Sequence, residues 1–243
     1  MSTRQGGVSR PPFDSLNLRP PCLPGEALDE VAHVLENQQR FAAALGAVPV
    51  WLDQVHGADV ALLEHGDLQP GRPLRRADAA VTAVPGLACT VLVADCLPVL
   101  LCADNGRAVG AAHAGWRGLA GGVVENCLTT LCAVAACEPA QVQAWLGACI
   151  GPREFEVGAD VLQAFGVEPR TADQPHFAYQ PRPTGEARWR ADLPALARER
   201  LRRAGLTRVS GGRWCTVASP SRFFSFRRDA RTGRMAAAVA LRA

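Results

Sequence analysis

Apolar residues recur at helical spacing over residues 28–45 and stop at Gly46, which predicts an amphipathic helix. From residue 48 to residue 114 the pattern changes to short runs rich in Val and Leu, separated by Gly, Pro and Asp, and these predict strands. The runs are VPVWLDQ, DVALLE, DAAVTA, ACTVLVA, PVLLCAD and AVGAAHA. Several of them lack a clean apolar–polar alternation, so we expect sheets that are covered on both faces.

The second half of the chain alternates between the two patterns. We expect helices at 118–136, at about 157–166 and at about 191–204, with a strand at VQAWLGAC between the first two. The segment 168–190 is rich in Pro, Arg and polar residues and predicts a long loop. Strand-like segments close the chain, near 214–217, 222–227 and 235–241. We therefore expect an α+β fold that takes in residues 1–243 as a single domain.

Composition places the chain among ordinary globular proteins, with 48% hydrophobic and 20% charged residues. The formal net charge is +3, and the basic residues are arginines spread along the sequence, which argues against a nucleic-acid partner. No apolar run in the sequence approaches the roughly 20 residues that a membrane-spanning helix needs. The first 15 or so residues contain no apolar run, so we expect no signal peptide, no membrane contact and a cytoplasmic location. Nine cysteines in a reducing compartment are core residues, nucleophiles or metal ligands rather than disulfides.

Three donor side chains stand where predicted strands end or begin. His56 follows one strand and precedes a glycine, and His113 ends another and leads into AGWRG. Cys96 lies between two strongly apolar strands, after Asp95, whose carboxylate is expensive to bury unless the protein uses it. Strand ends that converge on one side of a sheet would form a metal site. The spacing alone leaves open a buried thiol and two hydrogen-bonded imidazoles.

Several long motifs resemble one known family. They extend over nearly the whole chain and occur in this order: STRQGGVSRPPFDSLNL, WLDQVHGADV, ADCLPVLL, HAGWRG, IGPREFEVG and the segment from CT to FFSFRRD and TGR. Together they are similar to the YfiH-type laccase-domain family. The resemblance implies an α+β fold with mixed β-sheets packed between helices, and a metal pocket near the surface. It also places His56, Cys96 and His113 on the family's metal ligands.

The resemblance implies an enzyme that acts on purine nucleosides. The expected activities are phosphorolysis of adenosine, inosine, guanosine and methylthioadenosine, together with deamination of adenosine. The partners are then purine nucleosides and phosphate, and the protein is expected to be a monomer or a small homo-oligomer. The chain departs from the family pattern in the loop after Leu18, at Asn37-Gln38, where the family has Asn-Arg, and at Phe226, where it has tyrosine. It also begins almost at the STR motif, which an additional strand usually precedes in the family.

The donor set favours zinc over copper as the cofactor. Two imidazoles and a thiolate leave one coordination position open, as in catalytic zinc sites. The same set occurs in copper sites that add a weak axial methionine, but Met1 and Met235 are not near these motifs in the sequence. Five histidines are too few for a multicopper polyphenol oxidase, although copper remains the alternative metal.

Other residues are candidates for catalysis and substrate binding. We expect Asp95 to act with Cys96 and His113 in catalysis, either by moving a proton during deamination or by orienting a ligand. The HxE and PCxxC signatures of cytidine-type deaminases are absent. Arg4 and Arg117 are the candidate phosphate ligands, because a guanidinium binds two oxygens at once.

Asn17 and Gln54 are expected to contact the base or the ribose. A different class of enzyme also stays open. Cys96 and His113 would form the thiolate–imidazole pair of a metal-independent hydrolase or amidase that edits peptidoglycan precursors.

Overall fold

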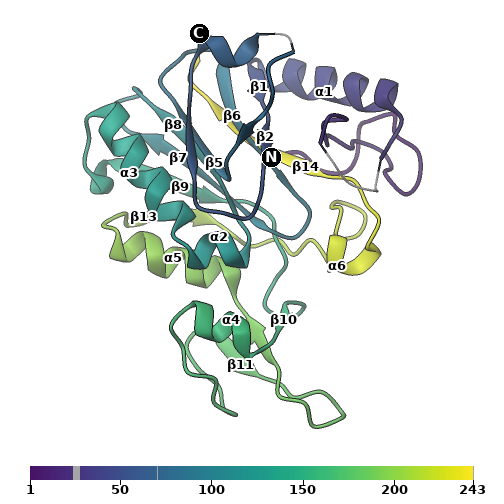
Figure 1. The fold of residues 1–243 in the computed structure, drawn as a ribbon, viewed down its shortest axis with the longest axis vertical. Helices are drawn as coiled ribbons and strands as arrows, with labels where there is room; N and C mark the ends of the chain where they lie inside the picture. Colours follow the sequence, from purple (N-terminus) through teal and green to yellow (C-terminus); the bar gives the residue numbers. More distant parts are fainter. Residues whose placement is uncertain (24–27, 70, 243) are drawn as a thin grey trace.

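A mixed six-stranded sheet forms the centre of the protein, which we describe from a computed structural model covering residues 1–23, 28–69 and 71–242 (Figure 1). Its strands in spatial order are β13 (Arg208–Gly211), β9 (Val142–Leu146), β7 (Leu97–Ala103), β8 (Val109–Ala114), β5 (Ala79–Thr82) and β3 (Val60–Leu63). The inner strands β9, β7, β8 and β5 pair antiparallel, and the two edge strands pair parallel with their neighbours.

A second sheet packs on one face of the first. It contains β1 (Val48–Val50), β6 (Leu87–Val93) and β14 (Met235–Ala240), and all seven residues of β6 are buried. The opposite face is covered by α3 (Val123–Ala135) and α5 (Leu193–Arg203), together with α2 (Trp116–Ala120) (Figure 1). Successive residues of β5 therefore enter different cores: Ala79 and Val81 pack with the helices, and Ala80 packs with β6. This explains the missing alternation and confirms the expected sheets with two covered faces.

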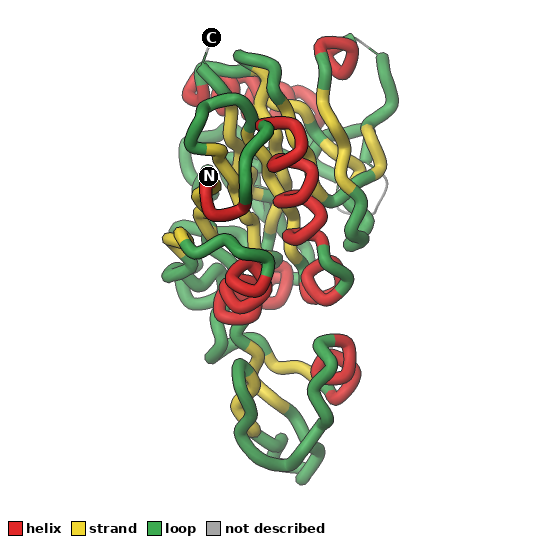
Figure 2. The backbone as a smooth tube through the Cα atoms, turned by 90° about the vertical axis from the view of Figure 1, so that its left-hand side faces the viewer, coloured by secondary structure: helices red, strands yellow, loops and turns green. Residues whose placement is uncertain are grey.

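The remaining elements are short. Two small sheets pair β10 (Glu156–Val157), β12 (Trp189–Ala191) and β11 (Phe177–Tyr179), and β2 (Leu52–Asp53) with β4 (Arg75–Arg76). The first of these sheets and α4 (Ala159–Ala164) project from the body of the molecule (Figure 2). The other helices are α1 (Val31–Leu45), α6 (Phe226–Asp229) and the 3₁₀ turns η1 (His65–Leu68) and η2 (Pro139–Gln141).

Most of the predicted helices are present, with shifted ends. α1 begins three residues later than expected and ends at Gly46, whose φ of 68° allows the chain to leave the helix. The helix expected at 118–136 is two helices, α2 and α3, because the chain turns at Gly122 with a φ of 96°. Among the described residues, no helix is both long enough and apolar enough to cross a membrane.

Three predictions for the C-terminal half were wrong. The segment 168–190 is not a pure loop, because β11 and the start of β12 lie within it and pair with each other. Within residues 214–217 only Cys215 pairs, in an isolated parallel bridge with Cys149, before the chain turns at 216–217, and the edge strand is β13 instead. The segment 222–227 leads into α6, where the Ser225 side chain caps the helix by accepting a hydrogen bond from the Arg228 amide. Phe223 and Phe224 are buried in the loop before α6, so their hydrophobicity alone did not indicate a strand.

Candidate active site

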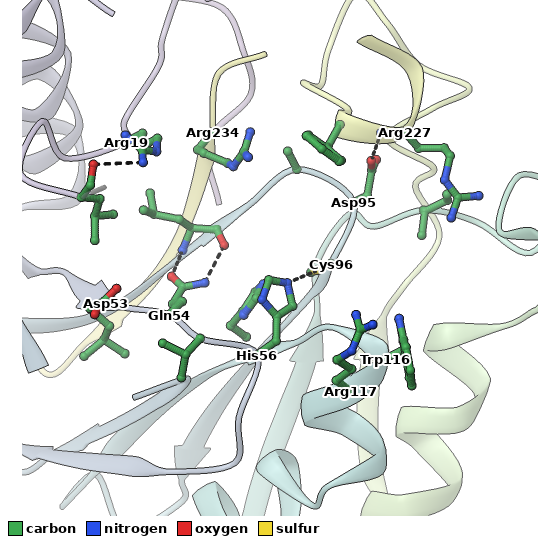
Figure 3. A pocket seen from close by; sticks show the side chains of 18 of the residues that line it. Arg19, Asp53, Gln54, His56, Asp95, Cys96, Trp116, Arg117, Arg227 and Arg234 are labelled. Atoms are coloured by element: carbon green, nitrogen blue, oxygen red, sulfur yellow. Dashed lines mark hydrogen bonds between the residues drawn. The ribbon is translucent and has the colours of Figure 1, made fainter. Parts of the chain in front are cut away.

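Three side chains from separate segments meet at one end of the central sheet (Figure 3). Cys96 directly precedes β7, and His113 is the penultimate residue of β8. These strands are antiparallel with Pro98 opposite His113, so the start of β7 lies beside the end of β8. His56 lies in the turn that follows β2. The donor atoms of the three side chains all lie within 4.8 Å of one another, and Sγ of Cys96 is 3.7 Å from Nε2 of His56.

A fully buried carboxylate, that of Asp78, contacts the imidazole of His113 and the backbone of His56. Its Oδ1 lies 2.9 Å from Nδ1 of His113 and accepts the backbone N–H of His56 at 2.9 Å. Its Oδ2 accepts the backbone N–H groups of Val55 and Gly57 at 3.0 and 2.7 Å. These bonds hold His56 at a φ of 61°, a conformation that non-glycine residues rarely adopt without such support.

The same contact determines which nitrogen of His113 faces the cluster. An ionised carboxylate only accepts hydrogen bonds, so Nδ1 carries the proton and Nε2 is left as a donor to a metal. Burial raises the pKa of Asp78, but the hydrogen bonds from His113 and from the Gly57 amide outweigh this effect and lower the pKa overall. Asp78 is therefore ionised at neutral pH.

Gly115 leaves the space in which the donors meet. A Cβ at this position would lie 2.8 Å from Cδ2 of His56 and 3.0 Å from Sγ of Cys96, closer than side-chain carbons approach in proteins. The glycine of the HAGWRG motif is thus required for packing against the cluster.

The arrangement fits a metal ion. With Zn–S near 2.3 Å and Zn–N near 2.0–2.1 Å, a tetrahedral ion separates its sulfur and nitrogen ligands by about 3.6 Å. The separation between Cys96 and His56 is 3.7 Å. Two imidazoles and one thiolate leave a fourth position for substrate, as in catalytic rather than structural sites. In the described parts of the chain, no second group of three His, Cys, Asp or Glu residues is placed to hold a metal.

Electrostatics in the cluster favours the thiolate that a metal binds. Burial raises the pKa of Cys96, but the charge of His113 and the hydrogen bonds from both histidines outweigh it and lower the pKa to about 6. Burial lowers the pKa of His113, but the charge of Cys96 and the hydrogen bond to Asp78 raise it to about 9. At neutral pH and without a metal, the pair is therefore a thiolate and an imidazolium.

Asp95 joins the cluster to the C-terminal part of the chain. Its carboxylate accepts hydrogen bonds from the hydroxyl of Thr216 and from the backbone N–H of Arg227, the latter at 2.6 Å. Its own φ is 100°, and its carbonyl accepts the Ile150 N–H at 2.8 Å. Both carboxylate oxygens are thus engaged by the C-terminal part of the chain, and the ligand-orienting role of Asp95, next to Cys96, stays a prediction. Proton transfer by this residue stays a prediction.

A cavity of about 880 Å³ opens over the donor cluster, within the range of small-molecule sites (Figure 3). Its lining is cationic overall, because two aspartates, Asp53 and Asp95, stand against five arginines: Arg19, Arg76, Arg117, Arg227 and Arg234. Phe226 also lines it and leaves 56% of its surface exposed, so an aromatic face is available to a ligand.

Two of the four predicted substrate residues line this cavity. Gln54 holds the backbone of Leu92 through both ends of its amide, at 2.7 and 3.0 Å. Arg117 stacks over Trp116, with its guanidinium carbon 4.2 Å from the ring centroid. Its guanidinium has no hydrogen bond or ion pair to any described residue, and it is therefore available to an anion.

The structure does not bring Arg4 or Asn17 into the cavity. Arg4 forms a salt bridge with Asp14 at 3.1 Å and donates to the carbonyl of Pro220, so it fastens the first residues to the C-terminal part. Asn17 is buried, and its side-chain oxygen accepts the backbone N–H groups of two pocket residues, Arg19 at 3.3 Å and Arg234 at 2.9 Å.

The sequence reasoning missed four residues that shape the site. Asp78 starts the apolar run DAAVTA, and a carboxylate in that position is the same signal that drew attention to Asp95. Gly115 gives no signal in the sequence beyond its place in the HAGWRG motif. Arg19 and Arg234 come from opposite ends of the chain, and nothing in their local sequence indicates that they meet.

Comparison with known proteins places the whole chain in one family. Residues 1–242 match the family described as "Multi-copper polyphenol oxidoreductase laccase". Purine nucleoside phosphorylase YfiH of Shigella flexneri is 46% identical over 242 residues, 98% of this chain and 91% of that protein. Purine nucleoside phosphorylase PA4543 of Pseudomonas aeruginosa is 45% identical with the same coverage.

Solved structures agree with this placement. Protein NMB0706 of Neisseria meningitidis superposes with a TM-score of 0.84 at 40% identity, covering 99% of this chain and 92% of that one. The hypothetical protein YfiH of Bacillus licheniformis superposes with a TM-score of 0.86 at 29% identity, covering 99% and 91%. The expected α+β fold with mixed sheets is thereby confirmed.

Proposed function

The chain belongs to the multi-copper polyphenol oxidoreductase laccase family, and we propose that it is a zinc-dependent purine nucleoside phosphorylase. The observation that carries this proposal is the His56–Cys96–His113 cluster at the floor of a cavity lined by arginines. The names of the similar proteins from Shigella and Pseudomonas support the phosphorylase activity. Adenosine, inosine, guanosine and methylthioadenosine are the proposed substrates.

The surroundings of the cluster support zinc rather than copper. A copper electron-transfer site adds a weak axial ligand, usually methionine. No methionine is among the residues that line the described cavity, and Met1 and Met235 pack together against another small core. A bound zinc ion supplies Lewis acidity at the open fourth position.

Different residues of the chain bind the metal, the phosphate and the purine. His56, Cys96 and His113 would hold the metal, while Asp78 orients the His113 imidazole and fixes the backbone of His56. The cationic lining attracts phosphate, and the exposed face of Phe226 offers a surface on which a purine stacks.

The proposed reaction balances without any further reactant. A phosphate oxygen forms a bond to C1′ of the ribose while the C1′–N9 bond breaks. The base leaves with the bonding electron pair and gains a proton, and the phosphate loses one. The products are the free base and ribose 1-phosphate.

We also propose adenosine deamination in the same cavity. The oxygen of a water molecule forms a bond to C6 of the purine while the C6–N6 bond breaks, the amino group takes up a proton and leaves as ammonia, and the other product is inosine. Asp95, the candidate for proton transfer, has both carboxylate oxygens engaged by Thr216 and Arg227, which leaves the proton carrier unassigned. Inosine formation from adenosine without phosphate tests this activity separately from base release.

The test of phosphorolysis is its dependence on phosphate. Purified protein loaded with zinc is incubated with adenosine or inosine, with and without phosphate, and free base and ribose 1-phosphate are measured. We expect equal amounts of both products, formed only with phosphate. Equal adenine release in phosphate-free buffer would indicate hydrolysis instead, and C96A serves as the inactive control.

A second function has a specific observation in its favour. The Cys96 thiolate, His113 and Asp78 have the chemistry of a cysteine–histidine–carboxylate triad, as in a hydrolase or amidase. Such an enzyme, acting on amide bonds of peptidoglycan precursors, works without a metal. Chelation separates the two proposals, because it abolishes activity of the metalloenzyme and leaves that of the cysteine hydrolase.

A further inference from the structure

Arg19 and Arg234 line the same part of the cavity, although they come from opposite ends of the chain (Figure 3). Their backbones are joined through Asn17, whose side-chain oxygen accepts an N–H from each, at 3.3 Å from Arg19 and 2.9 Å from Arg234. The carbonyl of Arg234 also accepts the N–H of Leu18 at 3.0 Å. Asn17 is itself fixed, because its amide donates to Asp29 at 3.0 Å. The two arginines are therefore held as a pair.

The pairing brings like charges together. Burial lowers the pKa of Arg234, and the neighbouring charge of Arg19 lowers it further. Burial also lowers the pKa of Arg19. Among the described residues, Arg234 forms no salt bridge, so no carboxylate compensates its charge by direct contact. The Arg234 guanidinium, with the charge of Arg19 acting on it, therefore favours an anion at this place, while Arg19 also donates to the carbonyl of Leu23 at 3.0 Å.

The free edge of Arg234 suits a tetrahedral oxyanion. Its Nη1 donates to the carbonyls of Thr232 and Gly233 at 3.1 and 3.2 Å, which fixes the plane of the guanidinium. Its Nε and Nη2 have no hydrogen-bond acceptor in the described structure. A guanidinium presents two such N–H groups in a fork that matches two oxygens of one phosphate.

The two arginines line the same cavity as His56, Cys96 and His113. The charges of Cys96 and Asp95 both act on Arg234, so the guanidinium lies within electrostatic range of the cluster. Gln54 and His56 line the same cavity between the arginines and Trp116 (Figure 3).

We propose that Arg19 and Arg234 form the oxyanion subsite of this cavity, in which they bind phosphate, and that Asn17 is the positioning residue that aligns them. The inference rests on the proposed phosphorylase function and assigns the phosphate to these two side chains instead of Arg4 and Arg117. Asn17 thus acts on phosphate through the arginines and does not contact the base or the ribose.

The experiment measures phosphate binding directly, by calorimetric titration of inorganic phosphate into the zinc-loaded protein. R234Q and R19Q should each weaken binding roughly 10- to 100-fold, the loss of charge-assisted hydrogen bonds. R234K should recover part of the affinity. R222Q is the matched control, since Arg222 stacks on Trp214 outside the cavity. Zinc content equal to that of the unchanged protein shows that each variant has kept its fold.

Steady-state kinetics tests the role of Asn17. N17D retains an acceptor but loses the amide donor to Asp29, and we expect it to raise the KM for phosphate while the KM for the nucleoside stays unchanged. An equal rise in both constants, or none, contradicts the positioning role. A merely structural effect would lower zinc content or thermal stability without this separation of the two constants.

The remaining outcomes are distinct. Unchanged phosphate affinity in R234Q and R19Q, with affinity lost in R117Q, overturns the proposal and leaves phosphorolysis intact. Affinity lost in R234Q, in a protein that releases no base from any nucleoside, supports the subsite and refutes the phosphorylase. A nucleoside 5′-monophosphate that binds more tightly than inorganic phosphate, and loses that advantage in R234Q, assigns the subsite to the phosphate group of a larger ligand and overturns the free-phosphate assignment.

Discussion

The buried carboxylate of Asp78 lies 2.9 Å from Nδ1 of His113, and the same oxygen accepts the backbone N–H of His56. One side chain therefore orients the imidazole of His113 and fixes the backbone of His56, and it does so without facing the substrate cavity. A metal held by the proposed donors would meet a His113 imidazole that needs no reorientation.

Loss of the Asp78 charge should weaken metal binding. D78N removes the negative acceptor that keeps the proton on Nδ1 of His113, and we expect zinc affinity to fall roughly 10- to 100-fold. Competition with a chromogenic chelator measures the affinity. D53N makes the same change on a residue that lines the cavity away from the donors, and it should bind zinc normally. Equal affinities of the two variants would contradict the role assigned to Asp78.

A methyl group at residue 115 should block the site. G115A places Cβ 2.8 Å from His56 and 3.0 Å from Cys96, so the donors must move apart. We expect the variant to fold but to lose stoichiometric zinc, as measured by elemental analysis. G57A is the matched control, because a Cβ there meets its neighbours at an ordinary 3.6 Å. Full zinc occupancy in G115A would show that the donors do not meet where we place them.

Removal of the thiolate or the imidazole should abolish metal binding without unfolding the domain. C96A and H113A each leave two donors, too few for a stable zinc site. Elemental analysis and circular dichroism follow the two properties. Activity lost on chelation should return with added zinc. If either variant keeps full metal occupancy, the ligand set is wrong.

The metal-free protein should show an unusually acidic cysteine. The pKa of Cys96 is lowered to about 6, so its thiolate fraction, and with it the rate of alkylation by iodoacetamide, should rise between pH 5 and pH 7 and then level off. Mass spectrometry of the modified peptide reports the rate at each pH. Zinc should protect Cys96 throughout this range. An alkylation rate that keeps rising through pH 9 would indicate an ordinary thiol.

The ring of Phe226 should contribute to nucleoside binding. If a purine stacks on its exposed face, F226A should raise the KM for inosine by a factor of about 5 to 150, the value of one lost stacking contact. F226Y keeps the ring and should leave the KM nearly unchanged. A KM in F226A equal to that of the unchanged protein would place the base elsewhere in the cavity.

Local patterns were sufficient for much of the fold. Apolar spacing predicted the helix α1, the run of buried strands from β5 to β8 and the final strand β14, because each is long or strongly apolar. The short elements β10 to β12 and α6 did not follow. A strand of two or three residues is stabilised by its pairing partner rather than by its own composition, and α6 depends on the cap supplied by Ser225.

The sequence by itself determined which residues carry the chemistry: His56, Cys96 and His113 each lie where an apolar strand stops, within motifs that resemble one family. Only the tertiary structure decided what surrounds them. It placed Asp78 behind the imidazoles, and it brought Arg19 and Arg234 together while keeping Arg4 outside the cavity. The physical reason is the sequence separation of the interacting residues. The periodicity of strands and helices depends on residues close together in the sequence, whereas contacts between distant segments depend on how the sheets pack.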